Sequence, residues 1–196
     1  MDVVRHLLSM AALDLNPART EDGTTPLLIA AQNGRTEVVQ MLLSAVGLDV
    51  NKAKHGGETA LLIACQEGHA ATVEALSLGP GIALNQADGD GFTPLLIACQ
   101  YNHVEAAKIL LEKDGVDANQ AQKATGLSSG VTPLIMACNY GHKDTVKLLL
   151  ATEGIDANKG STNGDTPLTV ARLLAKDPIL GGGAAELIQL LEAHTQ

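Results

Sequence analysis

Residues 93–100 read TPLLIACQ, and this stretch returns in nearly the same form along the whole chain. The other copies are TPLLIAAQ from Thr25, TALLIACQ from Thr59, TPLIMACN from Thr132 and TPLTVARL from Thr166. Successive copies start 34, 34, 39 and 34 residues apart. A fixed period of this length is typical of stacked supersecondary units, each of which buries its apolar side against its neighbours. The sequence therefore predicts a repeat array.

The unit that begins at Thr93 shows what one repeat contains. Thr93 can cap a helix, and Pro94 fits the first helical turn, where its missing N–H costs nothing. The helix should end near Asn102, at a slot that holds glycine in other copies and suits a left-handed backbone. A second amphipathic helix, VEAAKILLEK at 104–113, precedes the polar, turn-rich stretch 115–122. We expect a helix, a tight turn, a second helix and a hairpin-like finger, stacked into an all-α repeat solenoid.

The order of these features resembles the ankyrin repeat. The resemblance rests on G-x-T-P-L, followed by Ala, Gly-His, Leu-Leu and Asp-x-Asn, and it covers nearly the whole chain. It implies these units: a half-repeat with only a second helix and finger at 1–24; repeats at 25–58, 59–92, 93–131 with a lengthened finger, and 132–165; and a divergent C-terminal capping repeat at 166–196.

The sequence departs from the family pattern at several places. The histidine that follows Thr-Pro-Leu in the family, and ties finger backbones together, is replaced by Leu28, Leu62, Leu96, Ile135 and Thr169. This puts the hydrogen bonding between fingers in doubt and substitutes apolar packing. In the second complete copy, Ala60, Ser77 and Ala83 replace the usual Pro, Leu and Asp, so we expect that repeat to be the least stable.

The two ends and two insertions also depart from a regular array. Val3, Val4, Leu7 and Leu8 would lack half of their packing partners. We expect a fragment of a longer array, the alternatives being a natural short start or an edge that stacks on a second copy. Glycines 181–183 lie in an expanded turn, interpreted as a loosened loop of the capping repeat. The insertion in the third complete finger is either a neutral loop or a specificity element.

Composition narrows the classes of partner. The chain is 45% hydrophobic but 2% aromatic, which suits thin layers of Leu, Ile, Val and Ala. A net charge of −9 with scattered basic residues makes nucleic acid and anionic membranes poor partners. No signal peptide or membrane-spanning run is evident, and we expect a monomeric cytoplasmic protein with reduced thiols. Cys65, Cys99 and Cys138 share the slot of Ala31, which favours small buried hydrophobes over metal ligands or redox thiols.

The sequence shows no pattern that predicts catalysis or a cofactor. None of the six histidines has metal-ligand spacing, and the run DGDG from Asp88 lacks the ligands of a calcium loop. There is no nucleophile elbow and no dinucleotide fingerprint. We therefore expect no enzyme activity, metal site or cofactor.

The family resemblance implies partner contacts on a concave surface of fingers and first helices. The positions that it assigns in the middle copies are His55, Glu58, Gln66, Glu67, Asp90, Phe92, Gln100, Tyr101, Val131, Asn139 and Tyr140. The earlier and later copies supply Thr24, Gln32 and Asn33, then Thr162, Asn163 and Asp165. The chain has three aromatic residues, and all three belong to this set. Aromatic side chains dominate binding hot spots, although these could instead cover gaps between neighbouring units. The acidic members favour a basic partner, the alternative being that they serve solubility.

Two functions follow as hypotheses. The first is a non-catalytic protein–protein interaction module, and the second is a structural spacer, or a fragment of a larger ankyrin-repeat protein whose activity lies elsewhere. The resemblance also implies that Asn51, Asn119 and Asn158, in Asp-x-Asn fingers, are similar to substrates of an asparaginyl hydroxylase.

Overall fold

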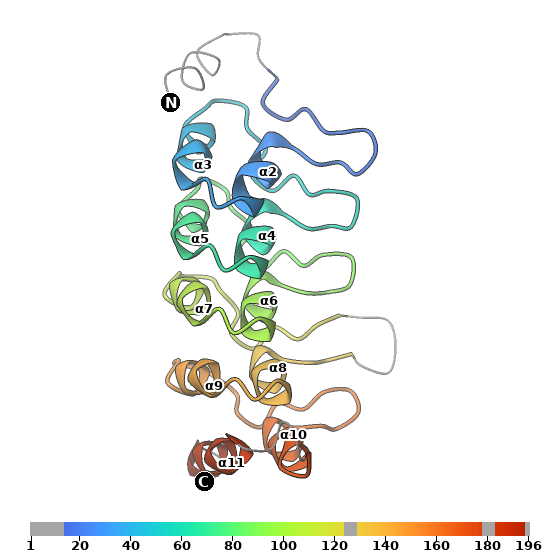
Figure 1. The fold of residues 1–196 in the computed structure, drawn as a ribbon, viewed down its shortest axis with the longest axis vertical. Coiled ribbons are helices and arrows are strands. Elements are labelled where there is room, and N and C mark those ends of the chain that lie inside the picture. The colour runs from blue at the N-terminus through green and yellow to red at the C-terminus, as the bar shows by residue number, and fades with distance from the viewer. Residues whose placement is uncertain (1–13, 124–128, 178–182, 195–196) are drawn as a thin grey trace.

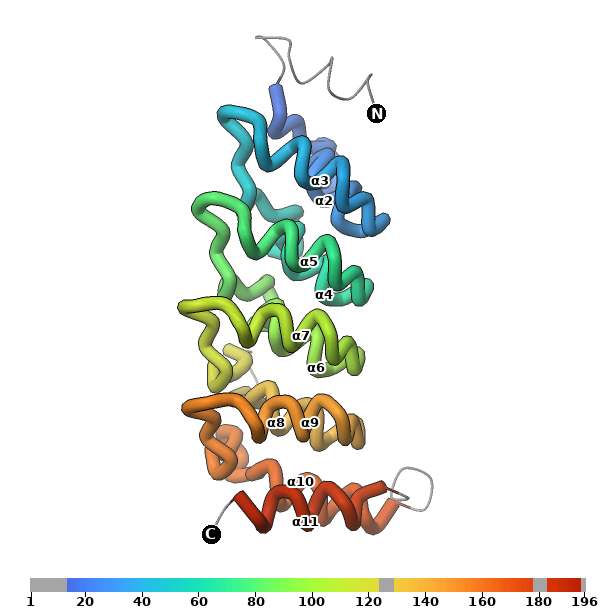
Figure 2. Tube along the Cα trace, turned by 90° about the vertical axis from the view of Figure 1, so that its left-hand side faces the viewer, coloured from blue at the N-terminus to red at the C-terminus, as the bar shows by residue number. Residues whose placement is uncertain are grey.

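The computed structural model describes residues 14–123, 129–177 and 183–194, and it shows an elongated stack of helix pairs (Figure 1). The first helices form an inner layer beside the fingers: α2 (Pro26–Gln32), α4 (Ala60–Gln66), α6 (Pro94–Gln100), α8 (Pro133–Asn139) and α10 (Pro167–Leu174). The second helices form an outer layer: α3 (Thr36–Leu43), α5 (Ala70–Ser77), α7 (Val104–Leu111), α9 (Lys143–Leu150) and α11 (Ala184–His194). Figure 2 shows the outer layer stacked in chain order from α3 to α11. The all-α solenoid is confirmed, and the described residues contain no strand.

Three expectations concern residues outside this description. They are the packing of Val3, Val4, Leu7 and Leu8, the inserted part of the third complete finger at 124–128, and most of the expanded glycine turn at 178–182.

The repeated Thr-Pro pair starts the inner helices as expected. The Thr93 hydroxyl accepts a hydrogen bond from the Leu96 N–H at 3.2 Å, and a threonine cap of this kind begins every inner helix. α6 ends at Gln100, earlier than the sequence predicted, because Tyr101 takes the cap position. Asn102 does adopt the left-handed backbone (φ 58°), and its side-chain oxygen accepts a hydrogen bond from Thr145 Oγ1 at 2.8 Å. Its amide group thus adds a link to the next repeat.

The core is one continuous apolar cluster that runs through the stack. The leucines that replace the family's histidine, such as Leu62 and Leu96, are completely buried in it. The three cysteines are free and buried. Burial raises the pKa of each thiol, that of Cys138 to about 12. They therefore behave as small apolar side chains in the interior.

Backbone hydrogen bonds join the fingers even though the family's histidine is absent. The Gly89 N–H donates to the Gly56 oxygen at 2.8 Å, and the Thr162 N–H donates to the Ser129 oxygen at 3.1 Å. Within a finger, the Asp88 N–H donates to the Phe92 oxygen at 3.0 Å and closes the hairpin. The doubt about hydrogen bonding between fingers was therefore misplaced, because backbone groups and the side chains of Gln122 and Thr162 provide it.

A ladder of asparagines fixes the spacing between repeats at the start of each finger. Asn85 Nδ2 donates to the Gly115 oxygen at 2.6 Å, and Asn85 Oδ1 accepts from the Asp117 N–H at 3.0 Å. Asn16, Asn51 and Asn119 each make the same pair of bonds to the next repeat. One side chain thereby satisfies a carbonyl and an N–H of the neighbouring unit.

Candidate partner-binding face

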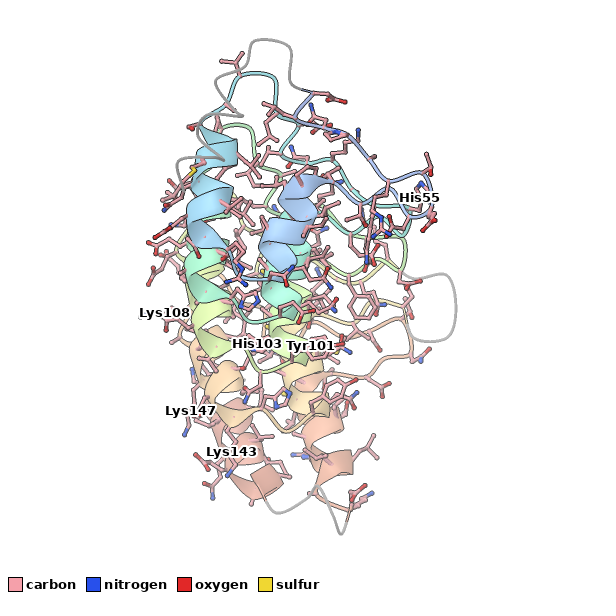
Figure 3. All side chains as sticks on the ribbon, turned by 45° about the horizontal axis from the view of Figure 1, so that its top comes forward. His55, Tyr101, His103, Lys108, Lys143 and Lys147 are labelled. Carbon is pink, nitrogen blue, oxygen red and sulfur yellow. The ribbon has the colours of Figure 1, made fainter. Side chains whose placement is uncertain are left out.

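The fingers and the C-terminal ends of the inner helices together form one side of the stack, which we call the finger face. Tyr101 and Tyr140 lie there, at the C-caps of α6 and α8, with 50% and 48% of their surface exposed. Each ring stacks on the histidine two residues later; the Tyr101 and His103 ring centroids are 6.2 Å apart (Figure 3). Both tyrosines are therefore held in place by a neighbour while one side of the ring faces solvent.

The stacked histidines also connect one repeat to the previous one. His103 Nε2 lies 3.0 Å from the Gln66 oxygen, and His142 Nε2 lies 2.9 Å from the Gln100 oxygen. These bonds satisfy carbonyls at the ends of α4 and α6, which have no partner inside their own helix. The ends of α2, α4 and α6, where partner contacts were predicted, are thus positioned by a histidine of the following repeat.

A pocket of about 270 Å³ opens on the finger face where the third and fourth complete repeats and the C-terminal repeat meet. Its lining residues are Phe92, Gln100, Gln122, Val131, Ile135, Met136, Asn139, Tyr140, Ser161, Asn163, Asp165 and Val170. Seven of these were predicted from the sequence as contact positions: Phe92, Gln100, Val131, Asn139, Tyr140, Asn163 and Asp165. The structure therefore gathers these seven positions around a single hollow.

The polar side chains of the pocket lining are four amides, two hydroxyls and one carboxylate. Gln100 Oε1 is buried without a hydrogen-bond partner among the described residues, while Gln100 Nε2 makes a long contact of 3.5 Å with the Tyr140 hydroxyl. Asp165 precedes the threonine cap of α10, and its N–H donates to Ser161 Oγ at 3.3 Å. Asp165 is the one lining residue of the described pocket with a formally charged side chain. The pocket lining thus carries one formal negative charge, and one amide oxygen of a lining residue is buried without a partner.

The other predicted residues lie outside this pocket. Towards the N-terminal end of the face, Glu58 pairs with Lys54 at 3.0 Å, and Gln66 Nε2 contacts Glu67 Oε1 at 3.4 Å. The His55 N–H donates to the Asp22 oxygen of the preceding finger at 2.8 Å, and His55 lies at the finger edge in Figure 3. Part of this group is therefore engaged within the protein itself.

Acidic residues gather on the fingers beside that group. Asp90 is exposed, and its neighbour Asp88 is half-buried, with Oδ1 accepting hydrogen bonds from the Asp90 and Phe92 N–H groups at 3.0 and 2.8 Å. Burial raises the pKa of the Asp88 carboxyl against these two hydrogen bonds, and the carboxylates of Asp90 and Glu58 raise it further. The middle of the finger face is therefore electronegative.

Sequence reasoning missed five of the pocket residues: Gln122, Ile135, Met136, Ser161 and Val170. A signal was available in the register. Gln122 and Ser161 each stand three residues after a ladder asparagine, and Met136 and Val170 occupy the same slot of the repeated phrase. What the sequence did not show is that these slots from adjacent repeats converge.

The described residues contain no cluster of three or more His, Cys, Asp or Glu side chains that could hold a metal ion. Among the helices of the described ranges, none is both long and apolar enough to cross a lipid bilayer.

A family model described as ankyrin repeats (3 copies) matches residues 1–54, 46–122 and 115–176. No curated protein matches the chain significantly. Ankyrin repeats are generally protein–protein interaction modules. The match spans most of the sequence and agrees with the helix pairs and fingers, so the chain belongs to the ankyrin repeat family.

Proposed function

We propose that the protein is a non-catalytic binding module whose finger face holds a protein partner, with the contact centred on Tyr101, Tyr140 and the adjacent pocket. The observation that carries this proposal is the position of the aromatic residues. Two of the chain's three aromatic side chains stand half-exposed on the same face, and the third, Phe92, lines the pocket together with Tyr140. Aromatic anchors at the rim of a pocket are the commonest contributors to binding energy.

The binding face is preformed, which favours tight recognition. The asparagine ladder, the histidine contacts and the backbone bonds between fingers fix each repeat against the next. A surface that is already ordered loses little conformational entropy when a partner binds. We propose a basic protein partner, because Glu58, Glu67 and Asp90 flank the tyrosines, and a monomeric protein in the cytoplasm, where the buried thiols stay reduced.

The experiment is a pull-down from cell extract with the wild-type protein and the variants Tyr101→Ala, Tyr140→Ala and the double variant. We expect the double variant to lose the captured proteins while its melting temperature changes by less than about 2 °C, because both rings are half-exposed. Leu78→Ala is the matched control: Leu78 is an exposed apolar side chain, 69% accessible, at the C-cap of α5 in the outer layer.

Three results would count against the proposal. If Leu78→Ala loses the same proteins, the capture is non-specific. If melting collapses in the tyrosine variants, the rings are structural. If capture is unchanged in the double variant, the finger face is not the binding surface, and a spacer role is the better explanation.

A further inference from the structure

We propose that the pocket on the finger face binds an arginine side chain of the protein partner. This inference rests on the proposed function and names the chemistry of the residue that the pocket recognises. It follows from three properties of the pocket: an apolar wall, a carboxylate among its polar groups, and a charge of one sign.

The apolar wall suits a long aliphatic stem. Phe92, Val131 and Val170 are half-buried, and Met136 and Ile135 are almost completely buried. These side chains come from two fingers and two inner helices, so they surround the hollow. Arginine and lysine bury their methylene groups against such surfaces while the charged end reaches a polar group.

The acceptors select against a purely apolar occupant. Gln100 Oε1 has no hydrogen-bond partner among the described residues, and the Asp165 carboxylate lines the same hollow. A leucine or methionine side chain in the pocket would remove water from the Asp165 carboxylate without replacing its hydrogen bonds, which is unfavourable for a charged acceptor. A guanidinium group supplies several N–H donors in fixed directions and can satisfy more than one acceptor.

The charge distribution also favours a cation. Asp165 carries a negative charge, and the lining contains no lysine or arginine. The labelled lysines Lys108, Lys143 and Lys147 lie on the outer layer, across the stack from the fingers (Figure 3). Arginine is favoured over lysine because its planar group also stacks on aromatic rings, and Tyr140 and Phe92 both face the pocket.

The test uses the ¹⁵N-labelled protein and four capped tripeptides, Ac-Ala-X-Ala-NH₂, in which X is arginine, lysine, citrulline or norleucine. Citrulline has nearly the shape of arginine but no charge, and norleucine keeps only the apolar stem. We expect millimolar binding of the arginine peptide in NMR titrations, with shifts of the Gln100 side-chain amide and of the Met136 and Val170 backbone signals. Lysine should bind more weakly than arginine, and citrulline and norleucine most weakly of all.

Two variants with the same change of net charge locate the effect. Asp165→Asn removes the carboxylate that lines the pocket, and we expect it to weaken the arginine peptide about 3- to 5-fold, as for a partly solvated ion pair. Asp90→Asn removes a carboxylate from an exposed finger position outside the lining, and it should change the affinity by less than about 1.5-fold. Gln100→Leu should weaken the binding of the arginine peptide, and it should leave the affinity for the norleucine peptide unchanged or slightly higher.

The proposal is overturned if no peptide binds at tens of millimolar, if norleucine binds as well as arginine, or if the two Asn variants behave alike. These outcomes are separable from failure of the proposed function. If the tyrosine variants lose the partner but Asp165→Asn retains it, the proposed binding face stands and the proposed arginine site is wrong.

Discussion

The inner and outer helix layers are built from the same repeats but are buried very differently. In α6, every residue from Pro94 to Cys99 is buried, whereas in α7 only Ala106, Ala107 and Leu110 are. The inner helices contact the inner helices above and below, the outer helix of their own repeat and the fingers, while the outer helices leave one face in water.

This difference explains where the sequence repeats itself and where it varies. A residue surrounded on all sides has few acceptable substitutes, since close packing penalises both cavities and excess volume. The inner helices α2, α4, α6 and α8 therefore repeat TPLLIACQ with few changes, whereas the exposed position just after this phrase holds Asn33, Glu67, Tyr101 and Tyr140. The following predictions test how far this contrast holds.

The largest effect is expected from a cavity in the inner layer. Leu96→Ala removes a completely buried side chain, and we expect a loss of about 3 kcal/mol in the free energy of unfolding, measured by urea denaturation. Ile109→Ala in α7 is the outer-layer control; Ile109 is only half-buried, so its loss should be roughly half as large. Equal losses at the two positions would mean that the layers do not differ in packing.

Replacing a glycine at the junction of two repeats should lower the stability more than replacing one in an outer-layer loop. Gly68 and Gly81 have nearly the same backbone, with φ of 72° and 74°. A methyl group at Gly68 would collide with the His103 ring, whereas at Gly81 it would meet open space. We expect Gly81→Ala to cost about 1 kcal/mol, from the left-handed backbone alone, and Gly68→Ala about 2 kcal/mol.

The comparison is read from chemical denaturation of the two glycine variants. If Gly81→Ala costs as much as Gly68→Ala, the left-handed backbone accounts for the whole effect. The contact of His103 with the end of α4 would then contribute nothing.

The asparagine ladder predicts that substituting the asparagine of a finger destabilises the protein more when another finger follows it than in the last finger. Asn85→Ala removes two hydrogen bonds to the next unit, and we expect a loss of about 1 kcal/mol in stability. Asn158 occupies the same slot in the last finger, where its side chain is exposed, so Asn158→Ala should stay within about 0.5 kcal/mol. Thermal melts of the two variants provide the measurement, and a larger effect at Asn158 would contradict the ladder.

The smallest effect is expected at a surface ion pair of the outer layer. Glu186 lies 3.0 Å from Lys143 and 2.6 Å from Lys147, and hydrogen bonds from these lysines lower the pKa of its carboxyl from 4.5 to about 2. A depressed pKa stabilises the folded state above pH 4.5, and this contribution is lost as the pH falls towards 2. Because the group is exposed, Glu186→Gln should lower the melting temperature by only about 1 °C at pH 7.

That small difference should shrink as the pH is lowered from 4.5 towards 2, and also when salt is added at neutral pH. Melting curves of wild type and Glu186→Gln across this range measure it. A difference that grows on acidification would mean that another group, not Glu186, determines it.

Some features could be predicted from the sequence because they depend on local chemistry. Thr93 and Pro94 predicted the start of α6, and Asn102 predicted the left-handed turn, since caps and turns depend on a few neighbouring residues. The burial of Leu96 and Cys99 followed from their slots in the repeated phrase. The end of α6 was placed too late, because helix termini depend on cap geometry that residue types do not fix.

Other features needed contacts between residues that are distant in the chain. The hydrogen bonding between fingers was doubted because the family's histidine side chain is absent. The backbone bond from Gly89 to Gly56 cannot be predicted from the residue types. Phe92, Val131 and Tyr140 were named from the sequence as contact positions, but no pocket was predicted, and Ser161 and Val170 were not included. Their contribution depends on how closely the C-terminal repeat stacks against its neighbour.

The sequence by itself determined the architecture, because a 34-residue period with capped, amphipathic helices can bury its apolar faces only by stacking on copies of itself. The tertiary structure decided which exposed residues meet. Gln100, Tyr140 and Val170 belong to three different repeats, and the rise and rotation from one repeat to the next bring them around one pocket. These offsets are set by the summed packing of many side chains, which no single motif encodes.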